Sequence, residues 1–284
     1  MPRIAYVNGR YLPLAEAAVS IEDRGYQFAD GVYEVIAFDR GGRLIDGEAH
    51  FDRLERSLRE IEMARPLPRR VLAVVLAELV RRNRLVEGIV YLQVSRGVAP
   101  RDHVYPKAVR PALVATVRRA RPPSAQAIEE GVGVVTQPDR RWRRCDIKSV
   151  GLLPNVMAKQ AAKEDGAYEA WMVDDAGRIT EGSSTNAWIV AADGTLVTRE
   201  AGPAILNGVT RMTLLRLARE AGLKVAERPF TLEEAKAARE AFLSSTTTWV
   251  LPVVSIDGVP VGNGHPGTQT RRMRALYQAA MAEW

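Results

Sequence analysis

The sequence predicts an α+β protein made of two domains. Short strand-like and longer helix-like patterns of apolar residues follow one another along all 284 residues, and the proline pair Pro122-Pro123 separates two such halves. The length also suits one large domain or two modest ones. We expect an N-terminal domain over residues 1–120, a linker over 121–125 and a C-terminal domain over 126–284.

The first half of the chain predicts a mostly antiparallel sheet with helices laid over one face. Apolar segments flank Asn8-Gly9, a dipeptide that favours the tight turn of a hairpin. In the strand expected over 31–38, Tyr33 and Val35 share one face, while Glu34 lies on the other. The other elements expected here are helices over 49–64 and 70–82, from the helical spacing of their apolar residues, and strands over 89–95 and 112–117.

The second half predicts another mixture of strands and helices. Thr231–Glu234 forms a capping box, which predicts the start of a helix, and Asp257-Gly258 predicts the turn of a hairpin over 254–261. A helix over 154–165 has proline near its start and Gly166 just after its end. The other elements expected are strands over 132–136, 170–173, 187–190 and 195–198, a helix over 211–221 and a final helix from about residue 268.

The composition is that of a folded globular protein, with 46% hydrophobic and 26% charged residues. No apolar segment is long enough to span a bilayer, and the N-terminus lacks the apolar stretch of a signal peptide, so we expect a cytoplasmic protein with no membrane partner. The single cysteine, Cys145, excludes an intrachain disulfide and a multi-cysteine zinc site. Three scattered histidines do not suggest a metal cluster, so we expect no metal.

The net charge of +6 does not by itself indicate a nucleic-acid partner. Only six of the 40 cationic residues are lysines, and the arginines are spread along the chain among acidic residues rather than concentrated in a stripe. The densest cluster is Arg140–Arg144, which we interpret as a solvated strand edge that influences the electrostatic field around Lys148. We therefore expect no nucleic-acid partner, and a basic nucleic-acid-binding module is the alternative from another class of function.

Three hydroxyl-rich segments in the second half are candidate anion sites: Glu181–Asn186, Asn207–Thr210 and Ser244–Thr248. The second leads directly into a predicted helix, whose free N–H groups and positive dipole end favour a phosphate. Each segment alone is more simply a turn or a cap. Three of them in one half of the chain favour a bound phosphate.

Lys148 differs from the other lysines in its sequence surroundings. It lies between the arginine cluster and an apolar stretch, whereas the others lie in polar or charged segments. A lysine in such a place can act as a nucleophile or form a Schiff base. A cofactor aldehyde with a phosphate and a ring nitrogen would account for Lys148, the hydroxyl-rich segments and an acid together. From spacing alone, a solvated lysine remains the simpler interpretation. The chain has no dinucleotide, nucleoside-triphosphate or serine-hydrolase motif.

Several segments resemble the fold-type IV (class IV) pyridoxal-phosphate aminotransferases. In the second half these are Cys145–Val150, Thr180–Asn186, Ile205–Arg211 and Ser244–Thr247, and in the first half Glu22–Glu34 and Arg96–His103. The first-half pair is similar to the D-amino-acid (D-alanine) transaminase branch, and the likeness covers nearly the whole chain in order. The resemblance implies a smaller N-terminal α/β sandwich, a larger C-terminal pseudo-barrel α/β domain, pyridoxal 5'-phosphate and a homodimer.

The resemblance also implies roles for individual residues toward the cofactor. Lys148 would bind the cofactor aldehyde covalently and then move the proton between substrate and cofactor. Glu181 would pair with the pyridine nitrogen and keep it protonated. The remaining cofactor contacts implied are Arg53 on the phosphate, the backbone of Val209 and Thr210 with Thr246 completing the phosphate site, Leu206 against the ring, and Ser184 and Thr185 in the loop beside it.

On the substrate side, the resemblance implies that Tyr33, Arg101 and His103 hold the α-carboxylate, with Val35 beside Tyr33. The planar guanidinium of Arg101 can meet a carboxylate in two hydrogen bonds. The loop that carries Arg101 and His103 would reach in from the neighbouring subunit, which implies an obligate homodimer. Without the resemblance, both residues are more simply part of a solvated loop.

The expected reaction moves the amino group of a D-amino acid such as D-alanine to a 2-oxo acid, 2-oxoglutarate or pyruvate. Alternatives on the same fold are an (R)-selective amine transaminase, a branched-chain L-amino-acid transaminase and a lyase of the aminodeoxychorismate type. We interpret Cys145 as a small buried thiol rather than a nucleophile. Trp249 could border the substrate pocket or pack in the core, and the sequence does not decide between the two.

Overall fold

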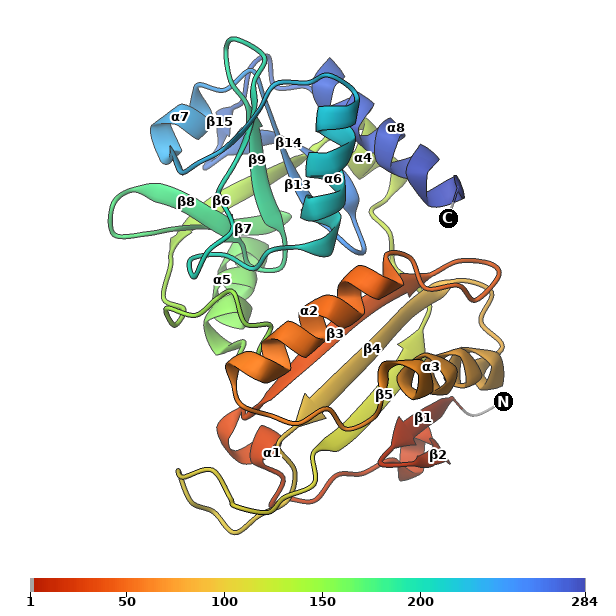
Figure 1. The fold of residues 1–284 in the computed structure, drawn as a ribbon. Helices are drawn as coiled ribbons and strands as arrows, with labels where there is room; N and C mark the ends of the chain where they lie inside the picture. The colour runs from red at the N-terminus through yellow and green to blue at the C-terminus, as the bar shows by residue number, and fades with distance from the viewer. Residues whose placement is uncertain (1–2, 284) are drawn as a thin grey trace. The chain divides into compact units, whose positions relative to one another are not determined.

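The computed structural model describes residues 3–283 (Figure 1). The chain divides into two compact units. The first unit extends to Arg121 and also contains the short segment Ile147–Gly151. The second contains Pro122–Asp146 and the chain from Leu152 onward. Within residues 3–283, no helix combines the length and the hydropathy needed to cross a membrane.

The first unit is built on a five-stranded, entirely antiparallel sheet in the order β2-β1-β5-β4-β3. Its elements are β1 (Ile4–Val7), β2 (Arg10–Pro13), a 3-10 turn (Leu14–Glu16), α1 (Arg24–Phe28), β3 (Gly31–Phe38), α2 (Gly47–Glu60), α3 (Arg69–Asn83), β4 (Gly88–Ser95) and β5 (Ala112–Arg118). The hairpin predicted at Asn8-Gly9 is present as β1 and β2. The predicted antiparallel sheet is therefore confirmed.

The core of this unit lies between the sheet and its two long helices, which cross the same face in Figure 1. Leu58 of α2 and Leu76 and Leu79 of α3 are at most 1% exposed, and they cluster with Val90 and Leu92 of β4. Burying a side chain of this size stabilises the fold by about 1.5–3 kcal/mol. The helical periodicity read from the sequence thus corresponds to the faces that pack on the sheet.

Strand β3 alternates as predicted. Glu34 is fully buried on the face that α2 covers, together with Val32 and Ile36, whereas Tyr33 and Val35 are half-buried on the opposite face. A carboxylate on the core face of a strand requires charged partners, because an unpaired buried charge is costly. Those partners come from α2 and are described below.

The second unit has a ten-stranded mixed sheet in the order β11-β10-β9-β13-β14-β6-β7-β8-β12, with β15 paired to β14. Its strands are β6 (Val132–Pro138), β7 (Glu169–Val173), β8 (Arg178–Gly182), β9 (Asn186–Val190), β10 (Leu196–Thr198), β11 (Val225–Glu227), β12 (Phe230–Thr231), β13 (Glu240–Ser245), β14 (Trp249–Ile256) and β15 (Val259–Pro260). Its helices are α4 (Ala125–Glu130), α5 (Leu153–Glu164), α6 (Val209–Glu220), α7 (Leu232–Lys236) and α8 (Thr268–Glu283).

Local signals place several ends of these elements correctly. The Thr231 hydroxyl accepts a hydrogen bond of 3.1 Å from the Glu234 N–H, which is half of the predicted capping box and begins α7. The hairpin at Asp257-Gly258 joins β14 to β15. The elements that periodicity does not predict are α1, α4, β8, β11, β12 and β13, each of which spans six or fewer residues.

The segment Ile147–Gly151 leaves the second unit and packs on the first. The Lys148 carbonyl accepts a hydrogen bond from the Tyr33 N–H (3.0 Å), and the Val150 N–H donates to the Gly31 carbonyl (3.1 Å). Ile147 is buried in the core of the first unit. Five residues between two stretches of the second unit therefore lie beside β3, and Lys148 is among them.

Candidate active site

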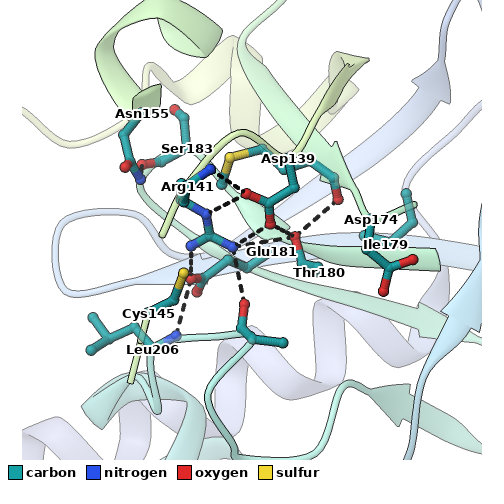
Figure 2. Close-up of polar contacts among 12 residues, drawn as sticks. Asp139, Arg141, Cys145, Asn155, Asp174, Ile179, Thr180, Glu181, Ser183 and Leu206 are labelled. Atoms are coloured by element: carbon teal, nitrogen blue, oxygen red, sulfur yellow. Dashed lines mark hydrogen bonds and ion pairs between the residues drawn. The ribbon is translucent and has the colours of Figure 1, made fainter. Parts of the chain in front are cut away.

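Glu181, near the end of β8, is a buried carboxylate of the second unit, and Figure 2 shows it beside Arg141. Its exposed fraction is 5%. One of its oxygens accepts a hydrogen bond of 3.0 Å from the Leu206 N–H, and the other accepts one of 3.0 Å from the Asn186 side chain. The Asn186 amide also donates to the Leu206 carbonyl (2.9 Å). Glu181 and Leu206, both expected at the cofactor, are thus in direct contact.

Arg141 is the charged partner of Glu181, and the interpretation of Arg140–Arg144 as a solvated strand edge is wrong for this residue. The Arg141 side chain is 6% exposed, donates to the Glu181 carboxylate and forms two hydrogen bonds to Asp139, of 2.7 and 2.9 Å. It also donates to the Ala204 carbonyl (3.0 Å). By contrast, Arg140 and Arg143 are exposed.

The hydrogen bonds and ion pairs around Arg141 shift the pKa values of Asp139 and of Arg141 itself toward their charged forms. Burial alone would raise the pKa of Asp139, but Arg141 outweighs burial and lowers the pKa. Burial alone would lower the pKa of Arg141, and the hydrogen bonds of Asp139 with the charge of Glu181 reverse this and raise it. An arginine with this pKa stays charged, so it stabilises the ionised form of the Glu181 carboxylate beside it.

The N-terminus of α6 follows directly on this cluster. The expected phosphate contacts Val209 and Thr210 are the first two residues of the helix, and both are buried. Its N-cap is Gly208, with no side-chain cap and no acidic residue in the first turn. A Cβ at Gly208 would lie 2.1 Å from Asn186 Oδ1, so only glycine fits against the residue that holds Glu181. Such an uncapped helix start suits an anion.

Glu169, a second buried carboxylate, holds the loop between β8 and β9. It is fully buried and accepts hydrogen bonds from the hydroxyls of Ser183, Ser184 (2.9 Å) and Thr185 (3.4 Å). Lys159 lies 3.4 Å from the same carboxylate. The sequence predicts a role for Ser184 and Thr185 but does not single out Glu169, because a lone glutamate at a strand start carries no pattern.

Thr246 lies in the turn between β13 and β14 and is half-buried. The Ser245 hydroxyl shapes this turn, because it lies 2.8 Å from Thr248 Oγ1 and accepts from the Thr248 N–H (3.2 Å). Trp249 follows in the left-handed region, at φ 59°, and its ring packs on Tyr277 of α8 at a centroid distance of 6.4 Å. Trp249 is thus partly buried and packs against the hydrophobic core of this unit.

Lys148 and Tyr33 meet in the first unit. The Lys148 ammonium nitrogen lies 4.2 Å from the centroid of the Tyr33 ring, and its backbone N–H donates to the Ser57 hydroxyl (3.3 Å). The ring face attracts a cation. Tyr33 also faces Tyr91 of β4, at 5.7 Å, and burial raises the pKa of Tyr91 to about 12, so Tyr91 stays neutral. Val35 is opposite Tyr91 in the sheet register.

Arg53, expected at the phosphate, forms a two-pronged ion pair with Glu34. Its Nε and a terminal nitrogen each donate to one carboxylate oxygen at 2.8 Å, and His50 Nδ1 lies 2.7 Å from the second oxygen. Burial alone would raise the pKa of Glu34, but Arg53 and His50 lower it to about 2. Burial also lowers the pKa of His50. The pair therefore carries its charges throughout the neutral range.

Arg101 and His103 follow β4, on an exposed loop. The Arg101 guanidinium carbon lies 4.8 Å from the centroid of the Phe28 ring, and the His103 ring meets the same ring edge-on at 5.3 Å. Among residues 3–283, neither side chain forms a hydrogen bond or ring contact with Tyr33. The structure therefore brings the two loop residues together on Phe28, and Tyr33 together with Lys148.

Cys145 is a buried thiol, as interpreted from the sequence. Its Sγ donates to the Trp142 carbonyl at 3.0 Å. Burial raises the pKa of Cys145 to about 11, so the thiol is not the reactive thiolate at neutral pH.

The donors present fit a cofactor with a phosphate, a basic ring nitrogen and an aldehyde. Glu181 supplies a carboxylate held ionised by Arg141, the partner that a protonated ring nitrogen requires. The uncapped start of α6 supplies backbone N–H groups for an anion. In the first unit, the Lys148 amine supplies the group that reacts with an aldehyde.

The sequence agrees with a known family over most of its length. The sequence model of the family "Amino-transferase class IV" matches residues 31–256. The chain belongs to the class IV aminotransferases. It is 44% identical over 271 residues to the D-alanine aminotransferase of Bacillus licheniformis, with 95% of this chain and 94% of that protein covered. It is 40% identical to the D-alanine aminotransferase of Listeria monocytogenes, with 95% and 93% covered.

Solved structures agree on the fold. The branched-chain amino acid aminotransferase of Escherichia coli superposes with a TM-score of 0.92 at 23% identity, covering 99% of this chain and 95% of that one. That of Thermobaculum terrenum, in its PLP form, has a TM-score of 0.84 at 25% identity, covering 99% and 94%. This class IV aminotransferase accordingly has the two-domain fold-type IV architecture, and its cofactor is pyridoxal 5'-phosphate.

Proposed function

We propose that this enzyme is a D-amino-acid transaminase, which moves the amino group of a D-amino acid such as D-alanine to 2-oxoglutarate or pyruvate. The observation that carries the proposal is the contact between the Lys148 amine and the Tyr33 ring, at 4.2 Å. It brings the expected catalytic lysine to the expected substrate-binding tyrosine. The similarity to D-alanine aminotransferases supports the choice of branch.

When bound, pyridoxal phosphate supplies an electron sink that stabilises negative charge at the substrate Cα. Lys148 would hold the aldehyde of the cofactor and would move the proton at the substrate Cα as general base and acid. Glu181 would pair with the ring nitrogen and keep it protonated. Arg141 stays charged beside the Glu181 carboxylate and so favours its ionised form.

The phosphate has two kinds of contact in this proposal. The N–H groups of Val209 and Thr210 bind it at the start of α6, with the Thr246 hydroxyl beside them. Arg53 adds a positive charge, with its guanidinium held in one orientation by Glu34. Leu206, Ser184 and Thr185 bound the ring.

The substrate α-carboxylate binds to Arg101, His103 and the Tyr33 hydroxyl, and Val35 lines the same face of β3 as Tyr33. A guanidinium can form two parallel, charge-assisted hydrogen bonds to a carboxylate. An amine without a carboxylate cannot use this clamp, so the proposal predicts discrimination against plain amines.

The proposal includes a homodimer. Ile21, Tyr26 and Val104, on or near α1 and its neighbouring loop, are 79%, 75% and 71% exposed. Apolar side chains grouped in this way are typical of a contact surface, and a second copy of the chain would cover them. Sedimentation at nanomolar concentration tests this, and a monomer that is fully active would contradict it. The cytoplasmic location and the lack of a nucleic-acid partner remain predictions.

The experiment that tests the function is a donor panel on the holoenzyme. D-alanine should bleach the visible absorbance of the cofactor, and L-alanine should not. Arg101→Ala should abolish most of the D-alanine activity. Bleaching by L-leucine alone would instead indicate a branched-chain L-amino-acid transaminase, and good turnover of 1-phenylethylamine that survives Arg101→Ala would indicate an amine transaminase. Pyruvate release without an amino acceptor would indicate a lyase.

A further inference from the structure

Phe28, the last residue of α1, is the common contact of three cationic or ionisable side chains. The guanidinium carbons of Arg24 and Arg101 each lie 4.8 Å from its ring centroid. The His103 ring meets it at 5.3 Å, with an angle of 61° between the ring planes. Arg101 and His103 are otherwise exposed, and among residues 3–283 neither side chain forms a hydrogen bond or an ion pair. The Phe28 ring is therefore a contact that both side chains share.

The loop behind these side chains is held by a different set of contacts. Arg24, 3% exposed, donates to the Asp102 carbonyl and to Asp30 (2.8 Å). Asp30 also accepts from Arg96 (2.7 Å), whose guanidinium carbon lies 3.6 Å from the centroid of the Tyr105 ring.

Arg96 is in turn fixed by the carbonyls of Ile61 (2.7 Å) and Glu62 (3.2 Å). Two buried arginines that share one carboxylate thus hold the loop backbone at Asp102 and the loop side chain at Tyr105. The hydrogen bonds and ion pairs that hold the loop backbone do not involve Phe28, although its ring also contacts the Arg24 guanidinium.

We propose that Phe28 is a positioning residue, which holds Arg101 and His103 in the orientation that receives the substrate α-carboxylate. A long arginine side chain on an exposed loop has many rotamers, and restricting them before binding lowers the entropic cost of binding. The aromatic face supplies this restriction through cation–π and edge contacts without competing for the guanidinium N–H groups. An acidic partner would occupy the N–H groups that the carboxylate needs.

This inference rests on the proposed function and makes a prediction of its own. In full-length holoenzyme, Phe28→Leu should raise the KM for D-alanine about 5- to 30-fold and change kcat by less than about twofold, because the lost contacts act on binding of the carboxylate. Phe28→Tyr keeps the aromatic face and should stay within about twofold of wild type. Phe28→Tyr is therefore the matched control, because it changes the same residue and keeps the aromatic face.

A second readout reports the contact without turnover. The Phe28 ring current shifts the ring-proton NMR signals of His103, which are identified by their loss in His103→Gln. Phe28→Leu should move these signals toward the position of an exposed histidine, and Phe28→Tyr should not. If Phe28→Leu does not fold, Phe28→Met replaces it, because methionine has a similar volume without the aromatic face.

The outcomes separate this inference from the function on which it rests. If Arg101→Ala abolishes D-alanine activity while Phe28→Leu leaves KM unchanged, the positioning role is wrong and the function stands. If Phe28→Leu lowers kcat with KM unchanged, the residue is merely structural, which also overturns the inference. If wild-type enzyme does not use D-alanine, the proposed function fails first.

Discussion

Glu34 in the first unit and Glu181 in the second are both buried carboxylates that accept hydrogen bonds from a buried arginine. Glu34 meets Arg53 through both oxygens and meets His50 as well, all from β3 and α2. Glu181 lies at a strand end, and its other donors are Asn186 and a backbone N–H. Arg53 meets Glu34 in a two-pronged pair, whereas Arg141 is shared between Glu181 and Asp139.

The difference shows that an arginine–glutamate ion pair can support either its cation or its carboxylate for binding the cofactor. In the first pair, the group that we assign to the cofactor is the cation, and the carboxylate supports it. In the second pair, the group assigned to the cofactor is the carboxylate, and Arg141 supports it. Asp139 gives Arg141 a second anion, so a change at Glu181 does not leave Arg141 buried without a partner. We therefore expect substitutions at Glu34 to affect stability most and substitutions at Glu181 to affect turnover most.

The largest expected effect is that of Glu181→Gln on catalysis. The amide has no charge with which to keep the ring nitrogen protonated, so kcat should fall about 10²- to 10³-fold, as for the loss of one stabilising group at a site of developing charge. The free energy of unfolding should fall less than in Glu34→Gln. Steady-state kinetics and urea unfolding on the same preparation measure both, and unchanged turnover would refute the role given to Glu181.

Glu34→Gln should cost stability on the order of 3 kcal/mol at pH 7, because it breaks a buried ion pair. The pKa of Glu34 is lowered from 4.5 to about 2, so the contribution is complete above pH 4.5 and is lost as the pH falls toward 2. Burial lowers the pKa of His50 from 6.5, so the folded protein takes up this proton less readily than the unfolded chain. The free energy of unfolding therefore falls further as the pH drops below 6.5.

Urea unfolding at pH 7 and at pH 3.5 tests this, and the gap between wild type and Glu34→Gln should narrow at the lower pH. Glu87→Gln is the control, because Glu87 is 67% exposed in its pair with Arg40 and should change stability by less than about 1 kcal/mol. If both variants lose the same free energy of unfolding, the buried Glu34 pair contributes no more to stability than the exposed Glu87 pair.

Arg141→Lys should lower kcat about tenfold, a smaller effect than Glu181→Gln. Lysine keeps the positive charge but lacks the planar fork that reaches Asp139 and Glu181 at once. Arg143→Lys is the matched control, since Arg143 belongs to the same cluster and is exposed. Equal activity of the two variants would show that the Glu181 carboxylate does not depend on Arg141.

The smallest expected effect is that of Cys145→Ala, which should leave activity within about twofold. Burial raises the pKa of Cys145 to about 11, so iodoacetamide at pH 7 should not inactivate the enzyme either. Assays before and after alkylation measure this. Rapid inactivation by modification of Cys145 would show that the thiol is reachable and belongs to the site.

Periodicity and turn signals predict the long helices and most of the strands, because these depend on neighbours in the sequence. They do not predict α1, whose five residues are too few for a helical pattern, and so they miss Phe28 as the contact of Arg101 and His103. Nor does any local signal indicate that Ile147–Gly151 packs on β3, since that depends on backbone hydrogen bonds between distant segments.

The motifs single out the residues proposed for the site, but they do not indicate which residues support them. Lys148, Glu181 and Leu206 lie in segments with a recognisable pattern. Their supports do not, because Arg141 is one arginine in a cluster whose other members are mostly exposed, and Glu169 is one glutamate among many. Burial decides which of several like charges forms the pair, and burial is a property of the fold.

Reduction of the holoenzyme with borohydride tests the central claim most directly, because it fixes a lysine–aldehyde linkage to the cofactor as a stable amine. A modified Lys148 resists trypsin, so mass spectrometry should find the phosphopyridoxyl group on the peptide that runs from Cys145 through Lys148 to Lys159. The label should be at Lys148, and Lys148→Ala should lose it. A label at Lys159 or Lys163 instead, in fully loaded enzyme, would contradict the account.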